Sequence, residues 1–378
     1  MCKKRNAKLV FTIGKFMNYA GGAEKSLAEI ISYLAEEGFE IVLIIIEPDV
    51  SKFKKPYYQI SNKIFIENVF PWKEDGFKCK HKKSDKFRIK RMKHLFLKHN
   101  PDAVFCFTIE KVLLNYKAIK NTGIPFVICH RNDPAVKIDY LLSKAKIKNI
   151  YRKTLNSAFK LAKFHVVQFD EYKYPFLNNN RVMVIPNVVN KVIPNNCEII
   201  QNNRVILNVG RLHEQKNQSL LIRSFYMIHN KYPGWVVKIY GDGPERDSLN
   251  NLINNLGLSD KVFLMGTTKD MDEVYRDAAV FAFPSVVEGF SRAHSEAMAY
   301  GLPSVALEKC IGSARLLSGG DCGYLVDDTA EKFSLALEKL LSDEDQRVVL
   351  GENASSSMSK FKPEEIYKLW LELIESEL

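Results

Sequence analysis

The chain contains 378 residues, of which 46% are hydrophobic and 26% are charged, and its 55 Lys and Arg outnumber its 44 Asp and Glu. This length allows two domains with cores of their own, and the composition excludes a disordered chain, a collagen-like repeat and a small disulfide scaffold. A membrane-spanning helix is not expected, because the longest aliphatic run, residues 41–46, is far shorter than the roughly 20 residues required.

The charge is divided unevenly between the two halves of the chain. Residues 1–195 carry 36 Lys and Arg and 17 Asp and Glu, whereas residues 196–378 carry 19 and 27, so the net charges of +19 and −8 sum to the formal +11. Such asymmetry indicates two domains with different partners. The seven cysteines include no Cys-x-x-Cys pair and no export signal is recognisable, so we expect reduced thiols and a cytoplasmic location.

Short apolar strands alternate with amphipathic helices in the first half. The hydrophobic periodicity predicts strands at residues 9–14, 39–46, 103–107 and 126–129, and helices at 23–37, 86–99 and 111–121. Strands that are apolar throughout and joined by helices are typical of a parallel sheet covered on both faces. We therefore expect an N-terminal α/β domain over residues 1–190.

A second alternation follows an asparagine-rich linker at residues 191–203. The sequence predicts strands at 205–209, 236–240, 262–265, 280–283 and 304–307, and helices at 218–231, 244–256, 271–278, 291–300 and 363–378. These patterns predict a second doubly wound α/β domain over residues 204–362. Two such domains imply a cleft between them, and open sheets of this kind bind ligands at the carboxyl ends of their strands.

The loop after the strand at 205–209 carries two cations. Gly210 ends the strand and lets a backbone approach a ligand, and Arg211 and Lys216 follow five residues apart. An arginine fork and a lysine ammonium together can neutralise a diphosphate. Taken alone, the same residues would equally describe a loop with two solvated cations.

Two carboxylates follow the strand at 280–283. Glu288 lies in the predicted loop and Glu296 about one turn inside the next helix. A carboxylate can accept hydrogen bonds from two hydroxyl groups, which suits a ribose or a hexose, and amides around Phe290 and Ser291 at the helix start suit a phosphate. Surface or capping roles for the two glutamates are the other interpretation.

Three further features come after strands of the two domains. Gly21 and Gly22 open the first helix and would allow close approach of a phosphate or sugar. His130 follows the strand at 126–129, where it could make a hydrogen bond or carry a proton, although a lone histidine is often structural. The turn at 241–245 is interpreted as mainly structural, with Pro244 at the first helical position.

In this order, the motifs resemble those of the retaining glycosyltransferases of family 4, which are group 1 enzymes of polysaccharide and lipid-linked glycan synthesis. The segments that carry the resemblance are Gly-Gly-Ala-Glu at 21–24, Val-Gly-Arg-Leu at 209–212, Gln-Lys-Asn at 215–217, Gly-Asp-Gly-Pro at 241–244, Glu-Gly-Phe at 288–290 and Glu-Ala-Met-Ala at 296–299. The resemblance covers essentially the whole chain. It implies a GT-B fold, with two Rossmann-like domains that face each other across a cleft.

The resemblance also implies roles for particular residues of the donor site. Arg211 and Lys216 are expected to bind the diphosphate of a nucleotide sugar, Glu296 its ribose, and Gly22 to lie against the diphosphate. Phe290 and Ser291 complete the expected donor site.

The expected catalytic residues are Glu288, which would face the transferred sugar, and His130, near the same sugar. The resemblance implies that no divalent metal or other cofactor is needed, because the cations and a helix dipole hold the leaving diphosphate. The helix at 363–378 is expected to pack back on the N-terminal domain. Two positions depart from the family's pattern: Arg315 stands where an acid is usual, and Val188-Val189 replaces a glycine-containing turn.

The basic residues of the first half gather in two stretches. Residues 73–98 contain 11 Lys and Arg and three Asp and Glu. Residues 137–163 have a helical apolar pattern and contain eight Lys and Arg and one Asp. We interpret them as a surface for anionic lipid or a lipid-linked acceptor, so that the protein would sit peripherally on the inner face of the cell membrane. The residues chosen for this surface are Lys82, Lys83, Arg88, Arg91, Lys144, Lys148 and Arg152. A solvated surface is the plainer interpretation, and nucleic acid is not expected because no binding motif accompanies the charge.

Three functions are compatible with these observations. The favoured one is a retaining transferase that moves a sugar from a nucleotide donor, UDP-linked by preference, to a glycan acceptor. The second is a non-catalytic basic protein that binds membrane or nucleic acid on the same scaffold. A phosphorylase- or epimerase-type activity is less favoured, because nothing marks a pyridoxal lysine or a second set of catalytic acids.

Overall fold

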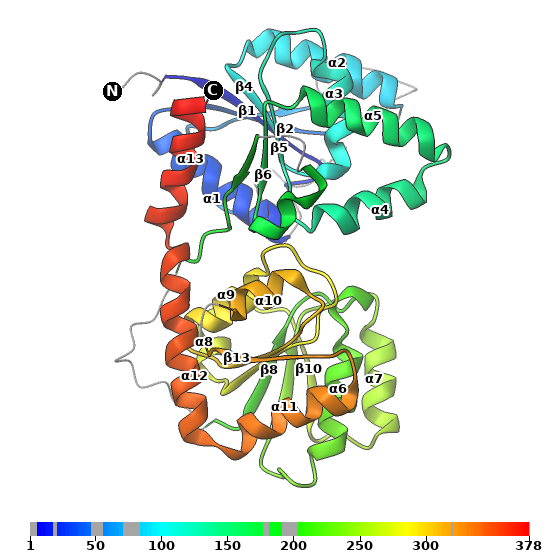
Figure 1. Ribbon diagram of the computed structural model, residues 1–378, viewed down its shortest axis with the longest axis vertical. Coiled ribbons are helices and arrows are strands. Elements are labelled where there is room, and N and C mark those ends of the chain that lie inside the picture. Colours follow the sequence, from blue (N-terminus) through cyan, green and yellow to red (C-terminus); the bar gives the residue numbers. More distant parts are fainter. Residues whose placement is uncertain are drawn as a thin grey trace. The chain divides into compact units, whose positions relative to one another are not determined.

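The computed structural model describes residues 6–17, 21–46, 56–70, 84–176, 181–190, 203–318 and 321–377. They form two compact units (Figure 1), the first drawn from Met1–Pro186 and Ile366–Leu378 and the second from Asn187–Glu365. The final helix, α13 (Pro363–Glu377), therefore contributes most of its length to the first unit. Most of the predicted linker, 191–202, lies outside the described residues.

The first unit is built on a seven-stranded sheet in which all paired neighbours are parallel. In sheet order its strands are β3 (Phe65–Asn68), β2 (Glu40–Ile45), β1 (Lys8–Ile13), β4 (Ala103–Cys106), β5 (Phe126–Cys129), β6 (Phe164–Val167) and β7 (Val182–Val184). The strands that the sequence missed are β3, β6 and β7. The first and last of these are the sheet edges, which are short and only partly buried.

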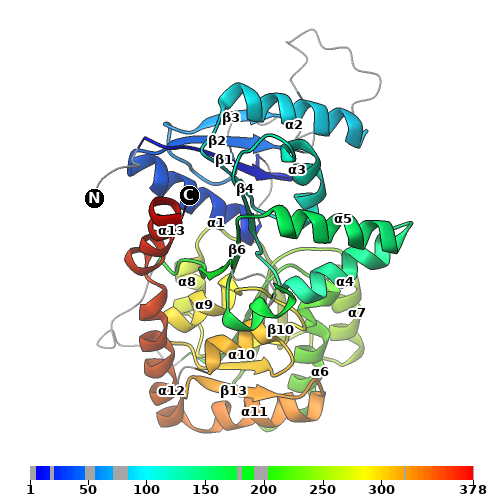
Figure 2. The same ribbon diagram turned by 45° about the horizontal axis from the view of Figure 1, so that its top comes forward.

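Helices cover both faces of this sheet. One face carries α2 (Asp85–His99), α3 (Val112–Ile119) and α5 (Lys148–Leu161), which Figure 2 shows side by side and which share one apolar cluster with Val10 and Val104. On the other face, Phe105 of β4 stacks on Phe11 at 4.6 Å and its ring lies 6.2 Å from Trp370 of α13. Helix α1 (Gly22–Glu36) packs beside α13 through the stacked rings of Tyr33 and Tyr367.

The basic segment 137–163, predicted as one helical pattern, is two helices, and this prediction was wrong. Helix α4 (Pro134–Lys144) ends at Ala145, whose backbone is extended, and α5 begins at Lys148. Tyr151 lies nine positions after Leu142, which corresponds to about two and a half helical turns. One continuous helix would therefore place its two apolar stripes on opposite sides, and the break lets both face the protein.

The second unit repeats the architecture with a six-stranded parallel sheet. Its strands, in sheet order, are β10 (Val262–Gly266), β9 (Val236–Tyr240), β8 (Val205–Val209), β11 (Val280–Phe283), β12 (Ser304–Leu307) and β13 (Gly323–Val326). One apolar cluster joins the sheet to α6 (Gln218–Ile228), α7 (Arg246–Asn255) and α11 (Ala330–Ser342). The remaining helices are α8 (Met271–Arg276), α9 (Arg292–Ala299), α10 (Ile311–Leu317) and α12 (Glu344–Ser357).

The turn after β9 supports the structural interpretation of its glycines, but Pro244 is not at the first helical position. Helix α7 begins only at Arg246, because residues 243–246 first make a turn in which the Arg246 amide donates to the Gly243 carbonyl. A Cβ at Gly241 would lie 1.9 Å from the Gly210 carbonyl oxygen, and one at Gly243 would lie 2.3 Å from that of Leu212. Both glycines are therefore required by the close approach of the β8 loop.

His294 of α9 occupies an apolar place in the second unit. It is fully buried, with its ring stacked 5.7 Å from Phe281 and 5.1 Å from Phe283. Within the described residues neither ring nitrogen has a hydrogen-bond partner. Burial lowers the pKa of His294 to about 3, so the imidazole is neutral in the folded protein at neutral pH.

We predict that His294→Leu raises the free energy of unfolding of the second unit by about 1–3 kcal/mol, because a buried polar group without partners is removed. It should also reduce acid sensitivity. Below about pH 6.5 the unfolded chain binds a proton at this histidine, whereas the folded protein does not, so protonation favours unfolding. The free energy of unfolding is therefore lowered by roughly 2 kcal/mol at pH 5.

The measurement is urea unfolding between pH 7.5 and 5, with His294→Gln as the matched control. Glutamine does not titrate but stays polar, so this control should reduce the acid sensitivity without the gain at pH 7.5. An unchanged pH dependence in both variants would contradict the prediction.

Candidate functional site

The strand order of the second unit reverses beside β8, which lies between β9 and β11. Because all strands are parallel, the loops that follow the adjacent strands β8 and β11 leave the same edge of the sheet as neighbours. Such a reversal is where open α/β sheets bind their ligands. The two loops are residues 210–217 and 284–291, which carry most of the predicted donor residues.

Lys216 and Glu288 meet across these two loops in an ion pair. The Lys216 Nζ lies 2.5 Å from Glu288 Oε1, and the two side chains are 21% and 12% exposed. The Phe283 ring centroid is 5.4 Å from the same Nζ, and a Cβ at Gly210 would lie 3.4 Å from Lys216 Cδ. Lys216, which is predicted to bind phosphate, and Glu288, which is predicted to face the sugar, therefore lie together in one partly buried site.

Gln215, which sequence reasoning did not select, holds the two loops together. Its side-chain Nε2 donates to the Val287 carbonyl at 2.5 Å, and its main-chain carbonyl accepts from the Val286 amide at 3.0 Å. The partners are more than 70 residues away in the chain, so no local pattern marks this glutamine. Arg211, in contrast with Lys216, has an exposed side chain.

The residues at the start of α9 have structural partners for their side chains. Ser291 is the N-cap, and its hydroxyl accepts from the His294 amide at 3.4 Å. The buried Phe290 ring packs edge-on to Phe361 at 5.0 Å, and its carbonyl accepts from Asn187 Nδ2 at 3.4 Å. What this turn can offer an anion is its backbone amides, as at other helix N-termini.

Glu296 is held from two sides by residues of α8 and α9. The Tyr275 hydroxyl donates to Oε2 at 3.1 Å, and Arg292 Nη2 lies 3.6 Å from Oε1. Burial, together with the charge of Glu296, raises the pKa of Tyr275 well above its usual value. The Glu296 side chain is 26% exposed, so the carboxylate is fixed but still reachable from solvent.

In the first unit, a buried cation follows β5 and contacts the start of α1. Arg131 Nη2 donates to Ser26 Oγ at 2.8 Å, and its guanidinium lies 4.8 Å from the Phe107 ring centroid. Gly22, the first residue of α1, is exposed beside this turn. The structure thus fixes the helix start that carries Gly22, through an arginine that sequence reasoning passed over.

His130 is buried and stacked on a second histidine, His165 of β6. Their rings lie 5.4 Å apart, with His130 Nε2 3.1 Å from His165 Nδ1, and His165 Nε2 is 3.2 Å from the Phe159 carbonyl oxygen. A carbonyl only accepts, so Nε2 of His165 carries the proton, its Nδ1 accepts from His130 Nε2, and Nδ1 of His130 is the acceptor. The order of tautomers along the pair follows from this one carbonyl.

Burial, and for His130 the neighbouring His165, lowers both pKa values, that of His165 to about 4 and that of His130 well below its usual range. His130 is therefore a neutral imidazole at neutral pH. It can form a hydrogen bond with a ligand, but it does not carry a permanent positive charge at this pH.

The predicted basic surface is divided among three helices. Lys144 ends α4, and Lys148 and Arg152 are exposed on α5. On α2, Arg88 and Arg91 are partly buried, and Arg88 pairs with Asp85 at 3.4 Å. Lys82 and Lys83 lie outside the described residues. In the parts of the chain that the structure describes, no helix is long and apolar enough to cross a membrane.

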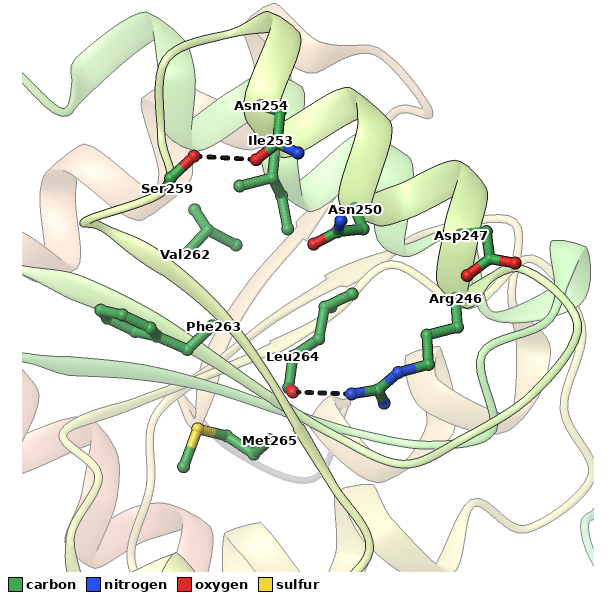
Figure 3. Close-up of a pocket in the computed structure, with 10 residues that line it drawn as sticks. All are labelled: Arg246, Asp247, Asn250, Ile253, Asn254, Ser259, Val262, Phe263, Leu264 and Met265. Carbon is green, nitrogen blue, oxygen red and sulfur yellow. Dashed lines mark hydrogen bonds between the residues drawn. The ribbon is translucent and has the colours of Figure 1, made fainter.

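A groove of the second unit lies at the sheet edge, between α7 and β10 (Figure 3). Arg246 at its rim donates to the Leu264 carbonyl at 3.4 Å, and Ser259 donates to Asn254 at 2.9 Å. The residues that line it include none of the predicted donor residues. The groove is therefore separate from the loops at the strand reversal.

Comparison with known proteins shows which proteins this chain is similar to. Residues 190–357 match the family model for glycosyl transferases group 1. A protein of Haemophilus influenzae named as an uncharacterized glycosyltransferase is 24% identical over 93% of this chain and 95% of its own. The amylovoran biosynthesis glycosyltransferase AmsD of Erwinia amylovora is 26% identical over 97% of this chain and 99% of its own.

Solved structures share the fold over nearly the whole chain. Sucrose-phosphate synthase from Thermosynechococcus elongatus has a TM-score of 0.80 at 17% identity, covering 98% of this chain and 99% of its own. HepE of Anabaena, in complex with UDP, has a TM-score of 0.74 at 18% identity, covering 98% and 100%. The expected GT-B fold with two Rossmann-like domains is confirmed. Residues 190–357 thus match the group 1 model, and the chain as a whole is similar to proteins named as glycosyltransferases, in agreement with the ordered motifs.

The two departures from the family's pattern have clear places in the structure. Arg315 is exposed on α10. Val188 and Val189 are 4% and 2% exposed, and the Val189 amide donates to the Phe361 carbonyl at 2.8 Å. These valines are core residues of the second unit.

Gly312 of α10 supports the loop that carries Glu288. A Cβ at this position would lie 1.9 Å from the Gly289 carbonyl oxygen and 2.9 Å from that of Glu288. Both neighbours are backbone, so they cannot move aside as a flexible side chain would. The helix and the loop are in contact only because residue 312 has no side chain.

We predict that Gly312→Ala lowers the rate of sugar transfer by roughly 10²-fold, because the expected catalytic residue Glu288 lies in this loop and a displacement of about 1 Å at such a group has an effect of this size. Gly257→Ala is the control: its positive φ of +67° gives backbone strain of roughly 1–2 kcal/mol, but a Cβ there meets nothing within 4 Å. Steady-state transfer and thermal unfolding are measured for both. Equal losses of transfer in the two variants would contradict the role of Gly312.

Proposed function

We propose that the protein is a retaining glycosyltransferase that moves a sugar from a UDP-linked donor to a lipid-linked glycan acceptor, without a metal ion, in surface polysaccharide synthesis. The observation that carries this proposal is the Lys216–Glu288 pair at the strand reversal. Support comes from AmsD, named for amylovoran biosynthesis, and from HepE, solved with UDP. A Campylobacter jejuni relative, 29% identical over 45% of this chain and 51% of its own, is named for a diphospho-undecaprenol-linked acceptor.

In this proposal the donor diphosphate is held by cations and amides of the second domain. Lys216 and Arg211 neutralise its charge, and the amides at the start of α9 add the positive end of a helix dipole. Gly22 at the start of α1 is the proposed contact from the first domain. These groups supply the charge stabilisation that a divalent ion gives elsewhere, so no metal is proposed.

Glu288 changes partner when the donor binds. Phosphate oxygens attract the Lys216 ammonium, which leaves the Glu288 carboxylate to accept hydrogen bonds from the sugar hydroxyls. His130, a neutral ring with an acceptor nitrogen, is the proposed second contact to that sugar. Glu296 accepts hydrogen bonds from the ribose.

The reaction we propose takes place on one face of the sugar. The bond between the anomeric carbon and the diphosphate oxygen breaks, and the acceptor hydroxyl oxygen bonds to the same face of that carbon. The hydroxyl proton passes to the departing phosphate oxygen, so that UDP leaves as the product. Lys216 and Arg211 stabilise the negative charge that develops on the diphosphate.

The acceptor side of the proposal rests on the surface of α4 and α5. Around Lys144, Lys148 and Arg152 the structure exposes Ile147 by 61% and Ile150 by 60%. Apolar side chains that insert into a bilayer and cations that meet its anionic headgroups are the two components of interfacial binding. We propose that this surface holds the protein on the cytoplasmic leaflet, where a lipid-linked acceptor is presented.

For the donor site we predict that Lys216→Met and Glu288→Gln each lower transfer by about 10²–10³-fold, the usual effect of removing one preorganised electrostatic contact. The readout is UDP released from UDP-sugars with acceptor, alongside thermal shift with each nucleotide sugar. Lys231→Met is the matched control, because Lys231 forms an exposed ion pair with Glu338 elsewhere in the same domain. It should leave transfer unchanged.

Each part of the donor proposal has an outcome that would overturn it. Near-native transfer in both site variants would exclude the roles of Lys216 and Glu288. Loss of activity in EDTA that Mg²⁺ restores would exclude metal independence. Salt-sensitive binding to vesicles without any transfer or hydrolysis would favour a non-catalytic binding protein instead.

For the membrane surface we predict that Ile147→Asp with Ile150→Asp lowers binding to vesicles of phosphatidylglycerol and phosphatidylcholine by at least tenfold, since buried apolar area is lost and negative charge is added. Leu335→Asp with Val349→Asp is the control pair, because these side chains are 54% and 56% exposed in the other domain. Cosedimentation measures both. Equal binding of the two double variants would contradict the proposed surface.

A further inference from the structure

The carboxylate of Glu296 has one oxygen bound to a buried phenol. Tyr275 is 2% exposed, and its hydroxyl oxygen lies 3.1 Å from Glu296 Oε2 and 3.4 Å from the Ala293 carbonyl oxygen. A phenol has a single proton, and the charged carboxylate at the shorter distance is the stronger acceptor. Tyr275 therefore donates to Glu296.

The position of the Tyr275 ring is set by its neighbours. Its centroid lies 5.2 Å from that of Tyr300, whose hydroxyl donates to Asp272 at 2.5 Å. The guanidinium of Arg276 lies 5.8 Å from the Tyr300 ring. Two adjacent tyrosines thus have separate partners, and of the two only Tyr275 donates to Glu296 in these contacts.

Arg292 would otherwise compete for the carboxylate. It lies four residues before Glu296 on the same helix, 10% exposed, with Nη2 at 3.6 Å from Oε1, which is an ion-pair distance and too long for a hydrogen bond. An arginine fork prefers to bind both oxygens of a carboxylate at once. The hydrogen bond from Tyr275 fixes Oε2, and because a carboxylate has about four acceptor positions, this bond does not by itself prevent Glu296 from accepting hydrogen bonds from a ligand.

A ribose presents its 2′ and 3′ hydroxyls side by side, and each can donate to one oxygen of a carboxylate whose plane is fixed. We propose that Tyr275 is a positioning residue that orients Glu296, against the pull of Arg292, to recognise the 2′,3′-diol of the donor nucleotide. This inference rests on the proposed function, in which Glu296 binds the ribose. It adds the residue that makes the recognition selective for ribose.

The experiment compares UDP with 2′-deoxy-UDP by titration calorimetry at pH 7.5. We expect the native protein to bind UDP at least about tenfold more tightly, the effect of one hydrogen bond to a charged group. Tyr275→Phe should remove most of this preference by weakening UDP and leaving 2′-deoxy-UDP nearly unchanged. Tyr300→Phe, which removes the neighbouring hydroxyl, is the matched control and should keep the preference.

Glu296→Gln tests whether the two residues act as one unit. It should lose the same preference as Tyr275→Phe, and the double variant should lose no more than either single variant, because the tyrosine acts only through the glutamate. Thermal unfolding of each variant confirms that the domain is folded at the temperature of titration.

The outcomes separate this inference from the function on which it rests. A native preference for UDP that persists in Tyr275→Phe, or an equal weakening of both nucleotides, would overturn the role of Tyr275 alone. A native protein that binds UDP and 2′-deoxy-UDP equally would overturn ribose recognition by Glu296. A native protein that binds no UDP would overturn the proposed function and this inference together.

Discussion

The ion pair between Lys216 and Glu288 is the contact that the loops of the second domain have to bring together. A partly buried pair is favourable only when both charges are held at short distance, since each has lost part of its hydration. Its two residues come from loops 72 positions apart, so the neighbouring structure must bring them together. Gln215 ties the loops by side chain and backbone, and Gly312 allows α10 to support the one that carries Glu288.

The glycines of this domain follow from the same requirement. The β8 loop lies directly against the turn after β9, where a Cβ at Gly241 or Gly243 would overlap backbone oxygens. Close packing of backbone on backbone leaves these loops little freedom. The ion pair is therefore placed on a rigid support, and in the proposed function the binding of a diphosphate needs only an exchange of partners by Lys216.

The first domain uses a different chemistry at its strand ends. After β5, Arg131 is buried over Phe107, and the stacked pair of His130 and His165 is neutral because burial lowers both pKa values. Its large positive charge is instead on outer helices, where α4 and α5 expose isoleucines beside lysines and arginine. The uneven charge of the chain thus separates a proposed lipid-facing surface from a region of neutral hydrogen bonding.

The sequence by itself determined the fold class, most of the central strands and the two loops that carry the proposed donor residues. It could do so because these features are local: an apolar run, a glycine at its end, a cation or carboxylate a few residues on. Only the tertiary structure decided how those residues are paired. Gln215, Tyr275 and His165 act on groups 21 to 72 residues away, and a glutamine, a tyrosine or a histidine has no periodicity that reveals such a partner. The edge strands β3 and β7 and the break between α4 and α5 were missed for a related reason, since burial against neighbouring segments, which sets both, appears only when the chain is folded.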